Sequence, residues 1–390
     1  MNETATLALA MATLGQIALC TTVLAMRSAQ WPGYWALATF FIATGIVSAG
    51  PLVPAFFPAL ESRYFAITIP AYLLLGPALF LYVEGLTSER AWRPQRRDAL
   101  HLIPFGFGLI AMVLANSLSA PERHEIFVVG DTSGALYPAV VVMFIFALVL
   151  GWMIQSGYYV VRILYRLTSY RRRLRMLFAS TENSELGWIG WLLLIIGTTW
   201  LLSFVTLVFD NFTGRSFAGP QTAALMSLVL VWSLASWGLR QKPGFEGRYL
   251  DDETDVTPTP PPNPGSDAKY TRSALTVEQA GRIAAKIEVA MVRDQIYLDP
   301  AISLPALARH IGAPTNHISQ TLNETIGECF FDYINKWRIR AAEPRISAGS
   351  ETILEVAMTV GFNARSSFYK AFKRETGQTP SEYRRSKSEG

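Results

Sequence analysis

Long apolar stretches fill the first part of this chain and set the strongest limit on how it can fold. Seven of them reach the roughly 20 residues that a helix needs to cross a bilayer core about 30 Å thick. They lie near residues 5–26, 34–57, 64–84, 99–119, 135–161, 188–209 and 218–239. Because the lipid offers no water to pair with backbone groups, runs of this length have to be helical. Residues 1–242 are therefore predicted to form a seven-span membrane domain of the kind that senses a signal.

Arginine is distributed unevenly between the loops that join these stretches. The loops after the third and fifth stretches are basic, with Arg90, Arg93, Arg96 and Arg97 in one and Arg162, Arg166, Arg171, Arg172, Arg173 and Arg175 in the other. The loops on the opposite side hold one arginine each, at Arg63, Arg123 and Arg215. Cytoplasmic loops keep the positive charge. We therefore expect a multi-pass protein of the bacterial inner (cytoplasmic) membrane, with its N-terminus outside and its C-terminal part in the cytoplasm.

The arginine run YRRRLR at residues 170–175 has two interpretations. It could form a patch that binds nucleic acid, but it directly follows a predicted membrane span. Basic residues at that place commonly fix topology and contact anionic lipid headgroups. The lipid interpretation is favoured, which makes membrane lipid an expected partner.

The composition changes abruptly after Lys242. Residues 250–268 contain five acidic and no basic side chains, and five prolines fall between residues 258 and 264. Such a segment cannot build a core and is typical of an extended spacer. Residues 243–272 are thus predicted to be an acidic, Pro-rich linker that holds residues 273–390 away from the membrane as a mobile domain.

Sequence patterns of catalytic or metal sites are missing from the chain. GxSxG, HExxH and the P-loop pattern do not occur, and the two cysteines, Cys20 and Cys329, are far apart. We therefore expect no enzyme activity, no cofactor and no metal site. Ionisable groups inside membrane spans are ligand candidates by default, but Glu84, His101 and Asp210 all lie near span ends, where reaching water costs little.

The helical period returns after the linker and leads into an internal repeat. Ile283, Ile287, Ala290 and Met291 form one apolar stripe, as in an amphipathic helix. Farther on, Ala308 and Gly312 recur as Ala357 and Gly361, and Ile318, Leu322, Gly327 and Tyr333 recur as Phe368, Phe372, Gly377 and Tyr383. Each copy reads as a short helix, a turn at glycine and a second helix. This pattern predicts two helix-turn-helix units, at residues 303–326 and 352–376.

The strongest part of the repeat is GFNARSSFYKAFKRETGQTPSEYRR at residues 361–385. With the first copy it resembles the AraC/XylS family of bacterial transcription regulators, over roughly residues 276–386. The resemblance implies an all-α DNA-binding domain in which two recognition helices read successive major grooves of double-stranded DNA. It does not cover the apolar first part, so the predicted fold is all-α, a seven-helix membrane domain followed by an AraC-type double helix-turn-helix domain.

In the second unit, Phe368 and Phe372 should face inward and turn the basic side chains of the same helix outward. Arg365 and Ser366 match base-reading positions of the family, and arginine can donate two hydrogen bonds to a guanine edge. Lys370 is a further base or phosphate candidate. Lys373 and Arg374 are interpreted as phosphate contacts.

In the first unit, Ile318 and Leu322 should face inward, and three polar residues match contact positions of the family: Asn316, Ser319 and Gln320. Two features depart from the family. Leu322, Asn323 and Glu324 stand where a Phe-Lys pair is usual, which offers less positive charge to phosphate. Pro344 falls inside the helix that links the units, where it costs roughly 3 kcal/mol or forces a kink.

Two hypotheses follow for the whole chain. The leading one is a membrane-tethered one-component regulator that binds promoter DNA, is controlled by a small-molecule or membrane signal, and acts as a homodimer. The alternative is a membrane transporter or enzyme whose degenerate helix-turn-helix serves regulation or protein interaction. Glu324 and Pro344 favour the alternative.

Overall fold

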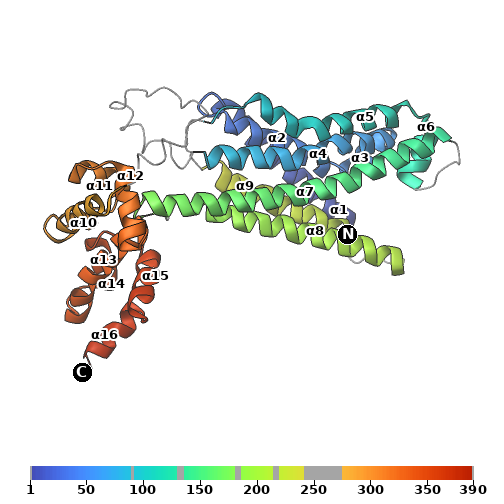
Figure 1. The fold of residues 1–390 in the computed structure, drawn as a ribbon. Helices are drawn as coiled ribbons and strands as arrows, with labels where there is room; N and C mark the ends of the chain where they lie inside the picture. Colours follow the sequence, from blue (N-terminus) through green and yellow to red (C-terminus); the bar gives the residue numbers. More distant parts are fainter. Residues whose placement is uncertain are drawn as a thin grey trace, which may run out of the picture. The chain divides into compact units, whose positions relative to one another are not determined.

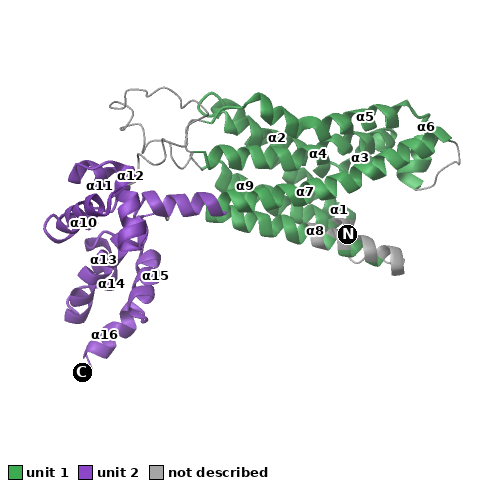
Figure 2. Cartoon of the chain, viewed as in Figure 1, with its two compact units in different colours: residues 1–167, 186–255 green, residues 168–185, 256–390 purple. Residues whose placement is uncertain are grey.

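The computed structural model describes residues 2–88, 92–129, 136–180, 186–213, 219–240 and 275–388. Within these ranges the chain is helical (Figure 1), apart from one isolated antiparallel bridge between Phe178 and Ser303. The prediction of an all-α fold is thus confirmed for the described residues. The chain divides into two compact units, residues 1–167 with 186–255 and residues 168–185 with 256–390 (Figure 2). The acidic linker predicted at residues 243–272 lies outside the described residues.

Apolar helices make up the first unit, to which α7 contributes residues up to Leu167. The elements are α1 (Asn2–Arg27), α2 (Gly33–Ser48), α3 (Leu52–Phe56), η1 (Pro58–Leu60), α4 (Glu61–Leu86), η2 (Arg96–Leu102), α5 (Ile103–Ser117), α6 (Ala120–His124), η3 (Glu125–Val129), α7 (Leu136–Leu177), α8 (Gly187–Thr213) and α9 (Pro220–Gly238). In the described chain, five segments are long and apolar enough to cross a membrane, and α2 and residues 187–199 are shorter apolar helices. The count of seven membrane spans stays a prediction.

Prolines shorten the second predicted stretch. Helix α2 has 16 residues and ends at Ser48, Pro51 precedes the five-residue α3, and Pro58 begins η1. At 1.5 Å per residue, α2 is only about 24 Å long, less than the thickness of a bilayer core. Pro70 and Pro77 have no such effect, since both lie within the 26-residue α4.

Two of the three ionisable groups near predicted span ends have partners in the protein. The carboxylate of Glu84 lies 3.2 Å from a guanidinium nitrogen of Arg166. Nδ1 of His101 lies 2.8 Å from the hydroxyl of Tyr159. These contacts account for both side chains without a bound ligand. The side chain of the third, Asp210, lies outside the described part of the chain.

Shorter helices build the C-terminal unit (purple in Figure 2). Its elements after the linker are α10 (Val277–Val292), η5 (Ile296–Leu298), α11 (Leu304–Ile311), α12 (Thr315–Gln320), η6 (Thr321–Ile326), α13 (Phe330–Ala348), α14 (Ile353–Thr359), α15 (Arg365–Thr376) and α16 (Pro380–Ser388). The predicted stripe of α10 is confirmed, because Ile283, Ile287, Ala290 and Met291 are all buried in one core. Helix α12 passes directly into the π-helical η6, so together they match the 12 residues of α15.

Helix α13 divides the C-terminal unit into two halves. Its first turns place Phe330, Tyr333 and Ile334 in a core with α10, α11 and α12. Its later turns place Ile339, Ala342 and Ile346 in a second core with α14 and α15. Each helix-turn-helix therefore packs on its own part of one shared helix.

The side chain of Arg338 joins the two halves, although it is fully buried. Its Nε donates to the carbonyl of Tyr297 at 2.7 Å, and NH2 donates to the carbonyl of Asp299 at 2.8 Å. Its guanidinium carbon lies 5.5 Å from the ring centroid of Phe362, which belongs to the second core. A buried cation is costly unless its donors are satisfied. Here backbone carbonyls of the first half accept hydrogen bonds from the guanidinium, and an aromatic ring of the second half lies beside it.

Candidate nucleic-acid interface

The second helix-turn-helix unit begins with a capped helix. The hydroxyl of Thr352 accepts from the backbone N–H of Glu355 at 3.2 Å, and the Glu355 carboxylate accepts from the Thr352 N–H at 2.8 Å. This reciprocal pair satisfies free N–H groups of the first turn of α14. The two hydrogen bonds from Thr352 also hold the pKa of Glu355 below its ordinary value. The start of the unit is thus fixed by local chemistry.

The turn of this unit requires glycine for two separate reasons. Gly361 has φ +92°, in the left-handed region that side chains with a Cβ rarely adopt. A Cβ at this position would also lie 2.7 Å from the carbonyl oxygen of Leu298 and 2.9 Å from that of Tyr297. Both the chain direction and close packing on η5 therefore depend on Gly361.

Helix α15 turns its aromatic side inward and its basic side outward. Phe368 and Phe372 have no exposed surface, as their spacing of four predicted. Arg365, Ser366, Lys370 and Lys373 are exposed on the same helix. The helix contains four basic residues and one acidic residue. The result is a solvent-facing cationic surface, and we call the exposed set Arg365, Ser366, Lys370 and Lys373 the α15 face.

The side chain of Arg365 is held at the start of this helix. Its guanidinium carbon lies 4.9 Å from the ring centroid of Tyr369, and NH2 donates to the Tyr369 hydroxyl at 3.0 Å. The hydroxyl of Ser381, and then Arg365, lower the pKa of Tyr369. Stacking limits the rotamers of a long side chain and leaves further N–H donors of the guanidinium open. Such a side chain suits planar, two-point recognition of a base edge.

The lysines and Arg374 differ in what they contact. Within the described residues, no hydrogen bond or salt bridge engages Lys370. Lys373 is near enough to Glu382 to help lower the pKa of that carboxyl, an effect to which hydrogen bonds from Thr379 contribute more. Both ammonium groups remain exposed to solvent, where phosphate could reach them.

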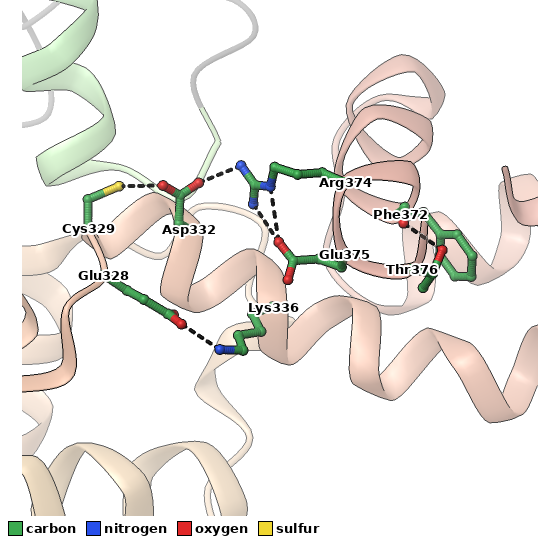
Figure 3. A network of polar contacts seen from close by, with 8 residues as sticks. All are labelled: Glu328, Cys329, Asp332, Lys336, Phe372, Arg374, Glu375 and Thr376. Carbon is green, nitrogen blue, oxygen red and sulfur yellow. Dashed lines mark hydrogen bonds and ion pairs between the residues drawn. The ribbon is translucent and has the colours of Figure 1, made fainter. Parts of the chain in front are cut away.

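Arg374 takes part in a polar network that the sequence did not reveal. Figure 3 shows it donating to Asp332 of α13 at 2.6 Å and to Glu375 at 3.0 Å. Asp332 also accepts from the thiol of Cys329 at 3.1 Å. Arg374 therefore links the end of α15 to the start of the shared helix. No local pattern could have found this pair, because 42 positions separate the partners. Its contact with phosphate stays a prediction.

The first unit has the same plan with less constraint at its turn. The hydroxyl of Ser303 accepts from the N–H of Ala306, and Gly312 ends α11 with φ +64°. A Cβ on Gly312 would meet no atom within 4 Å. Ile318 and Leu322 are fully buried, as predicted. The fold of this turn thus needs glycine only for its backbone angle.

The predicted contact residues of the first unit lie on a neutral to acidic surface. Asn316 is exposed, whereas Ser319 and Gln320 are half-buried. The amide of Gln320 donates to the carboxylate of Glu324 at 2.9 Å. The amide of Asn323 donates to the carbonyl of Ser319 at 2.8 Å. This segment has no lysine or arginine, so it offers hydrogen-bonding groups but no charge attraction to phosphate.

The linking helix runs on through Pro344. Helix α13 extends unbroken from Phe330 to Ala348, with Pro344 exposed within it. Buried neighbours Ala342 and Ile346 hold the turn in the second core. Arg384 also donates to the carbonyls of Ile346 at 3.2 Å and Glu351 at 2.7 Å. Tertiary contacts thus offset the hydrogen bond that proline removes.

Comparisons with known proteins show similarity over part of this chain. A family model described as a helix-turn-helix domain matches residues 307–386. A helix-turn-helix-type transcriptional regulator of Staphylococcus aureus strain COL is 32% identical over 90 residues, which are 23% of this chain and 12% of that protein. A protein of Streptomyces lividans described as an AraC-like transcription regulator is 29% identical over 92 residues, 23% of this chain and 30% of its own length.

Among solved structures, the C-terminal domain of AraT, a response regulator from Geobacillus stearothermophilus, is 23% identical, with a TM-score of 0.24. The matched part covers 29% of this chain and 88% of that domain. This chain therefore spans well under two thirds of the two full-length relatives, and the likeness concerns one domain. Residues 307–386 thus match a helix-turn-helix domain, and the chain is similar over part of its length to an AraC-like transcription regulator.

Proposed function

We propose that this protein is a membrane-tethered one-component transcription regulator. Its C-terminal unit binds promoter DNA in a sequence-specific way, and its apolar unit senses a small ligand, a lipid or a state of the membrane. The helix-turn-helix match and the regulators among its relatives support the DNA-binding part. The five long apolar helices among the described residues support the membrane part.

The α15 face is the single observation that carries the DNA-binding proposal. Fully buried Phe368 and Phe372 anchor α15 from behind and leave Arg365, Ser366 and Lys370 in solvent. Helices with this arrangement enter the major groove, where arginine reads guanine and lysine contacts phosphate. A basic helix face that served only to contact solvent would require neither the glycine turn nor a second copy of the motif.

The proposal includes a location and an oligomeric state. The protein is a multi-pass component of the bacterial inner membrane, with its N-terminus outside and its C-terminal unit in the cytoplasm, as the arginine distribution favours. Residues 269–390 hold 17 basic and 13 acidic side chains, a modest excess for binding a polyanion. Dimerisation would double the contacts. Cross-linking in membranes that traps only monomer while promoter binding persists would contradict this part.

A second candidate function rests on the first unit. The carboxylate of Glu324 accepts a hydrogen bond from the Gln320 amide and puts negative charge beside a predicted base-reading position. That surface suits a protein partner better than phosphate. A membrane transporter or enzyme that uses its helix-turn-helix for regulation or protein interaction is therefore the alternative.

Selection from a random duplex DNA library separates these functions. The full chain is reconstituted in lipid nanodiscs and used to capture DNA at several salt concentrations. The regulator enriches one motif, and its affinity falls as salt rises because bound phosphates release counterions. If no sequence is enriched at any salt concentration, DNA recognition is ruled out and the interaction-domain alternative is favoured.

A further inference from the structure

The end of helix α7 belongs to the C-terminal unit, although 96 residues of chain separate Ser180 from α10. Residues 168–185 group with residues 256–390, which Figure 2 shows as the purple end of α7. The structure describes this segment up to Ser180. We call residues 174–180 the α7 tail. Its contacts lie on the first half of the C-terminal unit.

Backbone pairing fixes the α7 tail beside the start of the first helix-turn-helix. Phe178 forms an antiparallel bridge with Ser303, and the N–H of Ala179 donates to the carbonyl of Ile302 at 3.4 Å. Ser303 is also the residue whose hydroxyl caps α11. The tail therefore pairs with the segment from which the first unit begins.

Apolar burial supports the same placement. Ala179 is 2% exposed and belongs to the first core, together with Leu304, Leu307 and Ala308. Leu177 packs against that core. Burial of apolar surface contributes on the order of 25 cal/mol per Å². The tail is thus a structural part of the first core and absent from the second.

Two arginine contacts complete the docking site. The buried Arg338 donates to the hydroxyl of Ser180 at 3.4 Å. The guanidinium carbon of Arg175 lies 5.8 Å from the ring centroid of Phe331. Arg175 ends the run that the sequence assigned to lipid headgroups, and Leu174 in that run is 1% exposed. At least part of the run therefore has a protein surface to contact.

We propose that the α7 tail is a docking element that couples the apolar unit to DNA binding. Its partner surface is formed by Ile302, Ser303, Phe331 and Arg338 of the same chain. Docking stabilises the first helix-turn-helix, and movement of α7 changes how that unit meets DNA, whereas the second unit keeps its own core. The docking contact goes beyond the proposed function, and only its effect on DNA rests on that function.

Disulfide trapping in the full chain tests the docking contact without DNA. Paired residues across an antiparallel bridge have Cα atoms about 4.5–5.5 Å apart, which suits a disulfide. Cys20→Ala and Cys329→Ala remove the two native thiols. In nanodiscs, the pair Phe178→Cys with Ser303→Cys should then cross-link on mild oxidation, as detected by peptide mass. The control pair joins Phe178→Cys to Ser381→Cys on the second half. A yield no higher than that of the control overturns the proposal.

A matched pair of charge changes tests the coupling. Ala179→Glu puts a carboxylate into the first core, whereas Arg172→Gln makes the same change in net charge at an exposed position. Hydrogen exchange of the full chain should speed up in α11 and α12 for Ala179→Glu alone, with α14 and α15 unchanged. The affinity of the Ala179→Glu variant for the library-selected DNA should fall about tenfold. Its footprint on that DNA should lose protection over one major groove. Hydrogen-exchange rates that change equally in both halves, or in neither half, would contradict the coupling. If the library yields no motif, the exchange result still decides whether the tail is docked.

Discussion

The two helix-turn-helix units of this protein keep the same buried positions and differ in what they show to solvent. Ala308, Ile318 and Leu322 in one unit correspond to Ala357, Phe368 and Phe372 in the other, and all six are buried. On the outside, α15 carries four basic residues, whereas α12 and η6 carry no lysine or arginine. The repeat thus preserves folding and leaves recognition free to diverge.

The units also differ in how each is held. The second has a capping box, a crowded glycine turn and the tie from Arg374 to Asp332. The first has an uncrowded glycine turn and receives the α7 tail at its start. We infer that the second unit is the fixed anchor on DNA and the first is the adjustable one. The following predictions test that division, from the largest expected effect to the smallest.

The glycine turns give the largest expected difference. Gly361→Ala combines left-handed strain with contact against two backbone carbonyls and should cost at least about 3 kcal/mol. Gly312→Ala has only the strain and should cost about 1–2 kcal/mol. Hydrogen exchange of the full chain in nanodiscs measures both, in α14 with α15 and in α11 with α12. Equal losses in the two variants would show that the crowding at Gly361 is relieved by small shifts.

The α15 face should divide into base reading and phosphate contact. Arg365→Ala should relax specificity at one base position and cost about 1–3 kcal/mol there. Lys373→Ala should weaken every sequence alike and reduce the salt dependence. Binding of both variants to a library of single-base changes separates these effects. Identical profiles across that library would show that the division of roles is wrong.

Charge on the first unit should tune affinity without changing the sequence that is read. Glu324→Lys places a cation where Glu324 now accepts from Gln320. It should raise affinity for all sites and steepen the salt dependence by about one phosphate contact. Glu324→Gln is the control that removes charge and adds none. If Glu324→Lys leaves the salt dependence unchanged, the first unit does not approach the phosphate backbone.

The tie between the units should have the smallest effect. Asp332→Asn removes the charge that pairs with Arg374, and both side chains are more than 40% exposed. Exposed ion pairs contribute about 0–1 kcal/mol, so stability should change little. Arg374 would keep its contact with Glu375 but become more available to phosphate, and the salt dependence of DNA binding should rise slightly. Thermal unfolding and salt titration of the variant check both statements. A loss of several kcal/mol would mean that the network holds the halves together.

Local patterns in the sequence were sufficient to predict the helices and the faces of those helices that are buried. The spacing of Phe368 and Phe372, and the glycines Gly312 and Gly361, predicted which sides face inward and where the chain turns. These are short-range properties of helix geometry. Pro51 and Pro58 marked where a predicted membrane stretch is interrupted, but hydropathy alone still counted it as one full span.

Contacts between distant segments were beyond such patterns. Arg374 looked like a free phosphate ligand because nothing near it in sequence reveals Asp332. The run at residues 170–175 was interpreted as lipid-binding, and nothing in it reveals that Arg175 lies near Phe331. Pro344 looked disruptive because the contacts of Arg384 that support its helix come from α16. In each case a tertiary contact joins distant segments, and one sequence holds no direct record of it.

Hydroxyl-radical footprinting of the full chain in nanodiscs, on the library-selected site, tests the central claim most directly. Two recognition helices that act together should protect two windows on one face of the duplex, centred about one helical turn, or roughly 10 base pairs, apart. Protection should weaken as salt rises, first in the window of the weakly charged unit. A single window unaffected by Ala179→Glu, or uniform protection along the DNA, would contradict the account.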